Sequence, residues 1–131
     1  MSSLIAKVAK IQRYNLLHIV EFDCYSKILY MISLDLTESI TIGREVKLTI
    51  KPSHIVIAKE FQGDISFPNR LECTILSIER GELLSNIKLR FFDYILETII
   101  MFKSYKEMKL KVGDRVVAMF KATELSIEEV I

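Results

Sequence analysis

The sequence predicts an all-β protein with short helical turns, arranged as two small five-stranded barrels. Two patterns lead to this prediction. Apolar and polar residues alternate with a period of two through most of the chain, which is the pattern of half-buried strands. The pattern of the first half then recurs in the second half, which indicates an internal repeat. Half of the residues are hydrophobic, so the chain has enough apolar material for a core.

The first half contains five predicted strands. Turns are expected at Tyr14-Asn15 and at residues 25–27, and a loop or single helical turn at residues 35–39. Pro52 separates the last two strands, because proline cannot donate a hydrogen bond to a sheet. The predicted strands span residues 4–11, 16–22, 28–34, 46–50 and 54–58.

The second half repeats this plan after a short linker at residues 60–68. A helix is predicted at residues 104–108, with Ser104 as its N-cap and Glu107 as the capping-box partner. The predicted strands span residues 71–78, 83–91, 94–101, 115–121 and 124–127. Five short strands with one helical turn, twice over, are typical of barrels of the oligonucleotide/oligosaccharide-binding (OB) shape. We therefore predict a first unit at residues 1–60 and a second at 66–131.

The repeat can be followed residue by residue. Four pairs are separated by 70 residues: Gly43 and Gly113, Lys51 and Lys121, Ser53 and Thr123, Ile57 and Ile127. Three earlier pairs are separated by 67: Leu4 and Leu71, Val8 and Ile75, Ile11 and Ile78. The first half therefore lacks about three residues near 32–39. Barrels this small are marginal alone, so we expect the units to pack together, exchange strands or dimerise.

Charge and composition disfavour several classes of function. The net charge of +1 argues against a broad nucleic-acid or membrane surface, and no apolar run is long enough for a membrane helix. No secretory signal is visible, and Cys24 and Cys73 are expected to be buried free thiols of a cytoplasmic protein. His18 and His54 have no partners at metal-ligand spacing, and no nucleophile–base pair stands out. We therefore predict neither an enzyme nor a metal held directly by side chains.

The same three-residue motif occurs near the end of each half. In the segments Lys51-Pro52-Ser53 and Lys121-Ala122-Thr123, a predicted strand is followed by a lysine, a small residue and a residue with a hydroxyl group. A lysine charge, a hydroxyl and free backbone N–H groups at one point suit a small anion. The alternative interpretation is a solvated lysine at a strand end beside a turn hydroxyl.

Residues 112–127 resemble the end of a Mop/TOBE (molbindin) domain, which has a Gly-Asp turn, a strand and Lys-(Ala/Pro)-(Ser/Thr). The resemblance covers nearly the whole chain as a tandem pair. It implies small β-barrels that assemble in twos or threes and hold molybdate or tungstate between subunits. It also implies that the lysine corners, with Ala122 and Pro52, contact the oxyanion.

Other site residues follow from this resemblance by position. The family motif Ser-Ala-Arg-Asn-x-Leu-x-Gly aligns with residues 66–73, which keeps Ser66 and Asn69 but places Pro68 at the arginine. Arg70 is a candidate substitute for that arginine. The family's Ile-Thr-x-x-Ser segment aligns with residues 100–104, which keeps Ser104 and replaces the threonine with Met101.

The resemblance implies a cytoplasmic, non-enzymatic protein that binds molybdate or tungstate for molybdenum storage, homeostasis or uptake regulation. Its expected partners are the oxyanion, further copies of itself as a dimer or trimer, and components of a molybdate ABC transporter. An assembly module with degenerate anion sites is the alternative, favoured by Pro68 and Met101. A third and weaker alternative is single-stranded nucleic-acid binding by the barrels.

Overall fold

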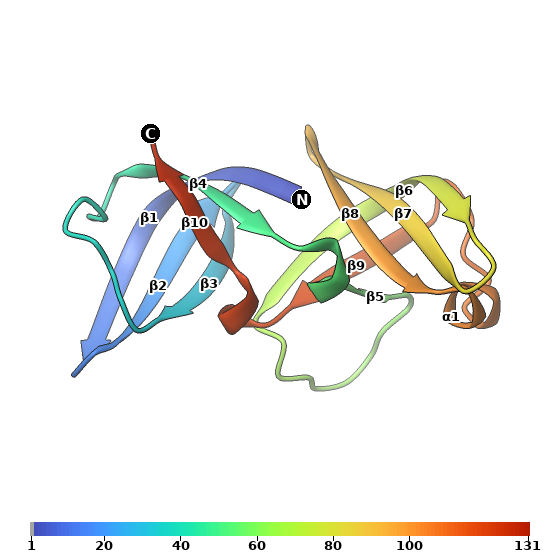
Figure 1. Ribbon diagram of the computed structural model, residues 1–131, viewed down its shortest axis with the longest axis horizontal. Helices are drawn as coiled ribbons and strands as arrows, with labels where there is room; N and C mark the ends of the chain where they lie inside the picture. Colours follow the sequence, from blue (N-terminus) through green and yellow to red (C-terminus); the bar gives the residue numbers. More distant parts are fainter. Residues whose placement is uncertain (1) are drawn as a thin grey trace.

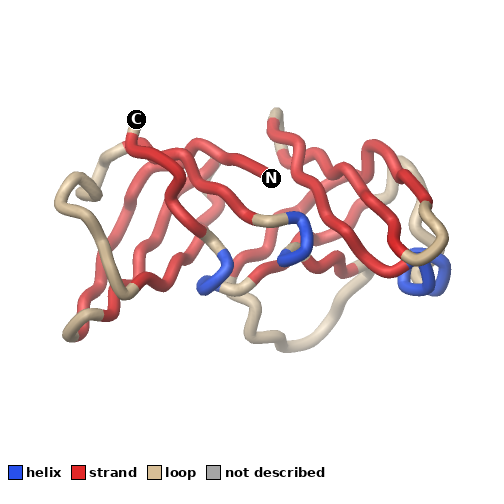
Figure 2. The backbone as a smooth tube through the Cα atoms, viewed as in Figure 1, coloured by secondary structure: helices blue, strands red, loops and turns tan. Residues whose placement is uncertain are grey.

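The computed structural model describes residues 2–131, which are mostly strands joined by short turns (Figure 2). The elements of the first half are β1 (Ser2–Tyr14), β2 (Leu17–Cys24), β3 (Lys27–Ser33), β4 (Glu45–Ile50), the 3-10 turn η1 (Pro52–His54) and β5 (Val56–Ala58). Those of the second half are β6 (Asn69–Arg80), β7 (Leu84–Phe91), β8 (Tyr94–Met101), α1 (Phe102–Glu107), β9 (Arg115–Phe120), the 3-10 turn η2 (Ala122–Glu124) and β10 (Ser126–Val130).

The strands form two five-stranded antiparallel sheets, each curled into a small barrel (Figure 1). The first sheet has the order β10-β4-β1-β2-β3, and the second has the order β5-β9-β6-β7-β8. Apolar side chains alternate inward along the strands, as in β4, where Val46, Leu48 and Ile50 are buried. This confirms the all-β prediction of two OB-like barrels.

The last strand of each half lies in the other half's sheet. β5 pairs with β9 of the second sheet, and β10 pairs with β4 of the first. In Figure 1, β10 accordingly crosses to the barrel that contains β1. If the repeat units are residues 1–60 and 66–131, as we propose, each unit gives its final strand to its neighbour.

The two halves have matching backbone geometry. Gly43 N donates to Val8 O at 2.7 Å, and Gly113 N donates to Ile75 O at 2.8 Å. Both glycines have positive φ values, +91° and +94°, a conformation that favours glycine. The irregularity in the β1–β2 pairing after Val8 also recurs in the β6–β7 pairing after Ile75.

The helix α1 differs from the prediction at its start. It begins at Phe102, with Met101 as the N-cap and no side-chain capping bond, so Ser104 lies inside the helix. The reason is that Phe102 N donates to Leu83 O at 2.8 Å, which turns the chain as soon as β8 ends. The expected N-cap role of Ser104 is therefore wrong.

Reciprocal contacts join the two barrels. The side chain of Asn69 in the second sheet accepts from Tyr30 N at 2.7 Å and donates to Tyr30 O at 2.9 Å. Ser2 occupies the equivalent position in the first half, and its hydroxyl accepts from Glu97 N at 2.8 Å. Both polar side chains are buried, and the apolar core continues from one barrel to the other. The interface thus has approximate twofold symmetry within one chain.

Candidate functional site

The two lysine corners have the same local structure. Lys51 precedes η1 with φ −75° and ψ 141°, and Lys121 precedes η2 with φ −78° and ψ 153°. Each lysine is in extended conformation and follows a strand whose last side chain, Ile50 or Phe120, is buried. The buried residue anchors the strand end, so the next side chain is directed to the surface. Both lysines are exposed, and no ion pair is recorded for either within residues 2–131.

The corners lie close together between the barrels, where the short turns η1 and η2 are neighbours in Figure 2. They meet through His54 and Glu124, whose Nδ1 and Oε2 atoms are 2.8 Å apart. Thr98 Oγ1 also donates to Ile55 O at 2.6 Å and fixes the end of η1 against β8. The relative position of the two corners is therefore held by side-chain contacts.

A hollow of about 170 Å³ lies at this meeting point. Lys51 comes from the first corner and Thr123 from the second, while Thr49 and Ser126 are direct partners in the β4–β10 pairing. The lining residues are Thr49, Ile50, Lys51, His54, Thr123, Glu124 and Ser126. Three hydroxyls and an ammonium can donate hydrogen bonds to an oxyanion here, and His54 engages the one carboxylate in the lining.

The hollow combines residues that the sequence had assigned to separate sites. Lys51 and Thr123 belong to different halves, and the strand exchange brings them together. Lys121 and Ser53 do not line this hollow. At the repeat positions equivalent to Thr49 and Ser126, the second corner has Met119 and Val56, which carry no hydroxyl. The chemistry of the two corners is therefore unequal although their backbones match.

Asn69 and Arg70 have structural contacts. The Asn69 side chain is fully buried, and its oxygen and nitrogen both bond the backbone of Tyr30. The Arg70 guanidinium donates to Phe67 O and Ile65 O, each at 2.9 Å, and so holds the loop before β6. Two of the N–H donor groups of Arg70 are therefore engaged by the backbone of its own loop.

The two predicted serines lie outside the hollow. Ser66 is exposed in the loop before β6, and Ser104 is half-buried in α1. Figure 1 shows α1 at the outer end of the second barrel, whereas η1 and η2 lie between the barrels. Within one chain, neither serine is brought to the hollow.

Sequence reasoning missed four polar lining residues, Thr49, His54, Glu124 and Ser126, and the apolar Ile50. His54 and Glu124 each follow a corner hydroxyl at the same repeat position, a signal that could have indicated a pair across the units. Thr49 and Ser126 gave no signal, because their proximity depends on the strand exchange.

The described residues contain no cluster of three or more metal-ligating side chains. Within 2–131, Cys24 and Cys73 are both buried free thiols, as predicted, and burial raises the pKa of Cys24 to about 11 and that of Cys73 to about 12. Among the described helices, none has the length and apolarity needed to cross a membrane.

Comparison with known proteins agrees with this architecture. Residues 65–127 match the TOBE domain family. Comparison with curated protein sequences gives no match. Among solved structures, the chain is similar to the cytoplasmic molybdate-binding protein ModG, crystallised with molybdate bound, with a TM-score of 0.86 and 18% sequence identity. The similarity covers 95% of this chain and 93% of that one. Residues 65–127 therefore match a TOBE domain, and the chain has over almost its whole length the fold of that molybdate-binding protein.

Proposed function

We propose that this protein binds molybdate or tungstate without catalysing a reaction, and that the hollow between the lysine corners is the principal site. The observation that carries the proposal is the convergence of Lys51 with three hydroxyls, those of Thr49, Thr123 and Ser126, around about 170 Å³. The fold of a molybdate-binding protein supports the choice of ligand. ModG is described as cytoplasmic, and we extend that location to this chain.

The physical argument rests on charge and donors. A tetrahedral dianion that leaves water needs several hydrogen-bond donors and partial neutralisation. Lys51 provides the charge, and hydroxyl groups can rotate to follow the oxygens of the ligand. The contact between His54 and Glu124 draws the carboxylate towards the imidazole, which reduces its repulsion of an anion. Lys121, Ala122, Pro52 and Ser53 would form a second, weaker site at the other corner.

We further propose that copies of the chain associate and that association completes the sites. Ser104 and Ser66 would then reach an oxyanion held by a neighbouring copy. Exposed apolar side chains on or next to two of the edge strands, β3 and β8, support such an interface. They occupy equivalent positions in the halves: Ile28, Ile32 and Leu34 next to or on β3, and Ile95, Ile99 and Met101 on β8. A dimer or trimer would bury both stripes.

Isothermal titration with molybdate, tungstate and sulfate tests the ligand. We expect saturable heat with molybdate and tungstate and weaker binding of sulfate. Lys51→Gln should weaken molybdate binding by roughly tenfold or more, because it removes a charged donor. Lys88→Gln is the matched control, since Lys88 is an exposed lysine on β7 and lines no part of the hollow. Flat traces for all three anions would refute the proposal.

A second function is favoured by specific residues. Pro68 and Met101 replace an arginine and a threonine of the resembled motif, and Arg70 is occupied by its own loop. These features fit an assembly module, acting with molybdate transporter components or a regulator, whose anion sites have degenerated. Size-exclusion chromatography with and without molybdate separates the two functions. Only the binding protein should show an assembly that changes with the ligand, whereas the module should keep one size throughout.

The biological role that follows from the first proposal is molybdenum storage, homeostasis or control of uptake. Reversible binding by a small chain suits all three roles. Measuring the molybdenum that copurifies from cells grown with and without added molybdate would test storage. A protein that stays free of molybdenum under both conditions would exclude it.

A further inference from the structure

A row of two arginines and a threonine crosses the outer face of the second barrel. Thr74 of β6 pairs directly with Arg115 of β9 on one side and with Arg90 of β7 on the other. Residues directly opposite one another lie on the same face of a sheet. The backbones of the two arginines are therefore about 10 Å apart, two strand spacings, with the Thr74 hydroxyl between them.

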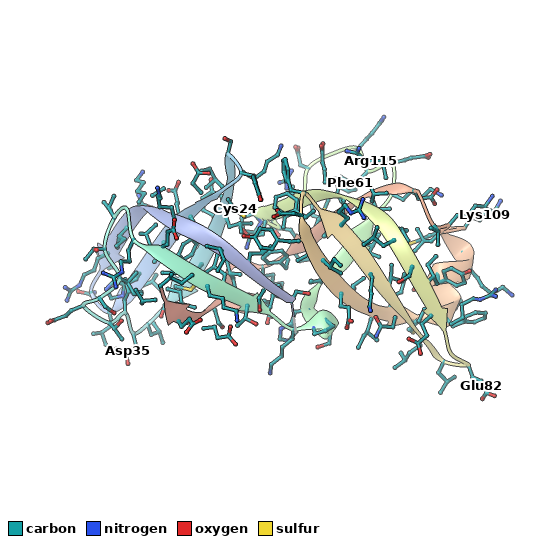
Figure 3. The ribbon with its side chains drawn as sticks, turned by 90° about the horizontal axis from the view of Figure 1, so that it is seen from above. Cys24, Asp35, Phe61, Glu82, Lys109 and Arg115 are labelled. Atoms are coloured by element: carbon teal, nitrogen blue, oxygen red, sulfur yellow. The ribbon has the colours of Figure 1, made fainter. Side chains whose placement is uncertain are left out.

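A cavity of about 230 Å³ lies over this row. Its lining comprises Lys27, Glu72, Thr74, Arg90, Phe91, Phe92 and Arg115. Lys27 comes from the start of β3 in the first barrel, so both barrels contribute cations. Arg115 lies at the surface of the second barrel (Figure 3), and its Nη2 is 3.8 Å from Glu72 Oε2. Within residues 2–131, no ion pair is recorded for Lys27 or Arg90.

A stacked pair of aromatic rings lies beside this cavity, and one of the pair, Phe92, lines it. The Phe92 ring stacks on Tyr25 with centroids 4.4 Å apart and an angle of 17°. Tyr25 lies in the turn before β3, and Phe92 lies in the turn after β7, both with positive φ. The stack fixes these turns against each other. It therefore holds Lys27 near the end of β7, where Arg90 lies.

The first barrel provides an internal comparison. The equivalent row there is Glu45, Lys7 and Asp23, because Lys7 pairs with both carboxylate residues. These side chains line a cavity of about 190 Å³ at the equivalent place. One lysine between two carboxylates is neutralised within the protein. Two arginines across a threonine, joined by a lysine and opposed by one glutamate, leave a local excess of positive charge.

We propose that this cavity, which we call the arginine pocket, binds a small phosphate anion of the pyrophosphate class. Guanidinium groups bind phosphate oxygens through paired N–H donors, and the Thr74 hydroxyl and the Lys27 ammonium add further donors. The arginine pocket shares no lining residue with the hollow at Lys51. The arginine pocket is therefore a separate site from the one proposed above for molybdate or tungstate.

Titration with inorganic pyrophosphate and with orthophosphate, followed by backbone amide NMR, tests this proposal. We expect saturable shifts at Thr74 and its strand neighbours, with tighter binding of pyrophosphate. Arg90→Gln and Lys27→Gln should each weaken pyrophosphate binding by roughly tenfold. Lys7→Gln, at the position equivalent to Thr74, is the matched control and should leave binding unchanged.

Several results would overturn the proposal. These are the absence of saturable shifts, an affinity for pyrophosphate in Arg90→Gln and Lys27→Gln that is unchanged from the parent protein, or a loss of the same size in Lys7→Gln, which would indicate a general charge effect. The two variants lie on different barrels, so a folding defect in one, seen by circular dichroism, leaves the other as the test. Lys51→Gln should retain pyrophosphate binding. If the protein fails to bind molybdate but binds pyrophosphate, the proposed function is refuted and the proposal for the arginine pocket is not.

Discussion

His54 Nδ1 lies 2.8 Å from Glu124 Oε2, and the two residues occupy the same position in the two halves, 70 residues apart. Two identical units related by a twofold axis would place like against like at such a point. Here the halves differ, so an imidazole faces a carboxylate. The same axis brings together Tyr25 and Phe92, which are equivalent at the offset of 67. The contact between the lysine corners therefore depends on differences between the repeats.

Exchanging these two residues should preserve their attraction. We expect His54→Glu alone to destabilise the protein, because it places two carboxylates opposite each other. Adding Glu124→His should restore most of the loss. Both side chains are about one-third exposed, so the coupling in a double-mutant cycle should be modest, about 0.2–1 kcal/mol. Urea unfolding of the two single variants and the double variant measures it; simple additivity would contradict the contact.

Replacing Asn69 should cost more stability than replacing Ser2. Asn69→Leu leaves both Tyr30 N–H and Tyr30 C=O without their partner, and each buried unsatisfied group costs about 1–3 kcal/mol. Ser2→Ala removes the partner of Glu97 N–H alone. We expect losses of about 2–4 kcal/mol for Asn69→Leu and about 1 kcal/mol for Ser2→Ala from urea unfolding. Equal losses would show that Asn69 does not act through its two bonds.

Asp114 should stabilise the protein in a pH-dependent manner. The Lys111 N–H donates to its carboxylate at 2.9 Å and the Lys59 ammonium at 3.1 Å, and these contacts lower the pKa of Asp114. The folded state therefore binds this proton less readily than the unfolded state. The stabilisation is fully present above the ordinary aspartate pKa of about 3.9 and is lost as the pH falls through the lowered folded value.

Asp114→Asn should accordingly be less stable than the parent protein at pH 7, and the difference should shrink in acid. Thermal unfolding of both proteins from pH 7 to pH 2 measures this. Glu82→Gln is a suitable control, because Glu82 is exposed in the connection between β6 and β7 (Figure 3), and no ion pair is recorded for its side chain within residues 2–131. A stability gap that stays constant across the pH range would contradict the role of the carboxylate.

The two thiols should react slowly in the folded protein. Burial is the first cause of the raised pKa values, about 11 for Cys24 and about 12 for Cys73. The reactive thiolate is therefore scarce at neutral pH, and the sulfur atoms are covered. We expect a disulfide reagent to modify both cysteines of the urea-unfolded protein. Over the same time it should modify neither cysteine of the folded protein. Cys24→Ser and Cys73→Ser assign any residual reaction, and rapid labelling of the folded chain would contradict this prediction.

Most of the fold could be predicted from local patterns in the sequence. The alternation around Val46 and Leu48, the glycines at 43 and 113, and the offset of 70 residues each reflect short-range geometry. Strand edges accordingly fell within a few residues of those observed, as with β4, predicted from residue 46 and observed from 45. The observed start of α1 differs from the prediction because the Phe102 N–H donates to Leu83 O. Leu83 lies in the connection between β6 and β7, far from α1 in the sequence.

The composition of the site could be predicted only in part. Lys51 and Thr123 were identifiable from the repeated lysine–hydroxyl motif, but their sharing of one hollow depends on which sheet receives β10. Exchange between halves and packing within each half bury similar surfaces, so the alternation of residues cannot distinguish them. For the same reason, the burial of Asn69 against Tyr30 is a property of the barrel interface that the sequence around Asn69 does not encode.

The position of β10 has a consequence for synthesis on the ribosome. The edge of β4 that faces away from β1 has no partner strand until Ser126–Val130 emerge, long after β4 itself has been made. During that interval the nascent protein presents an open strand edge, to which other polypeptides can add. Lys47, on β4, later contacts Glu128 at 3.0 Å, and until then its free charge discourages such pairing. The arrival of β10 closes this edge and also completes the lining of the hollow beside Lys51.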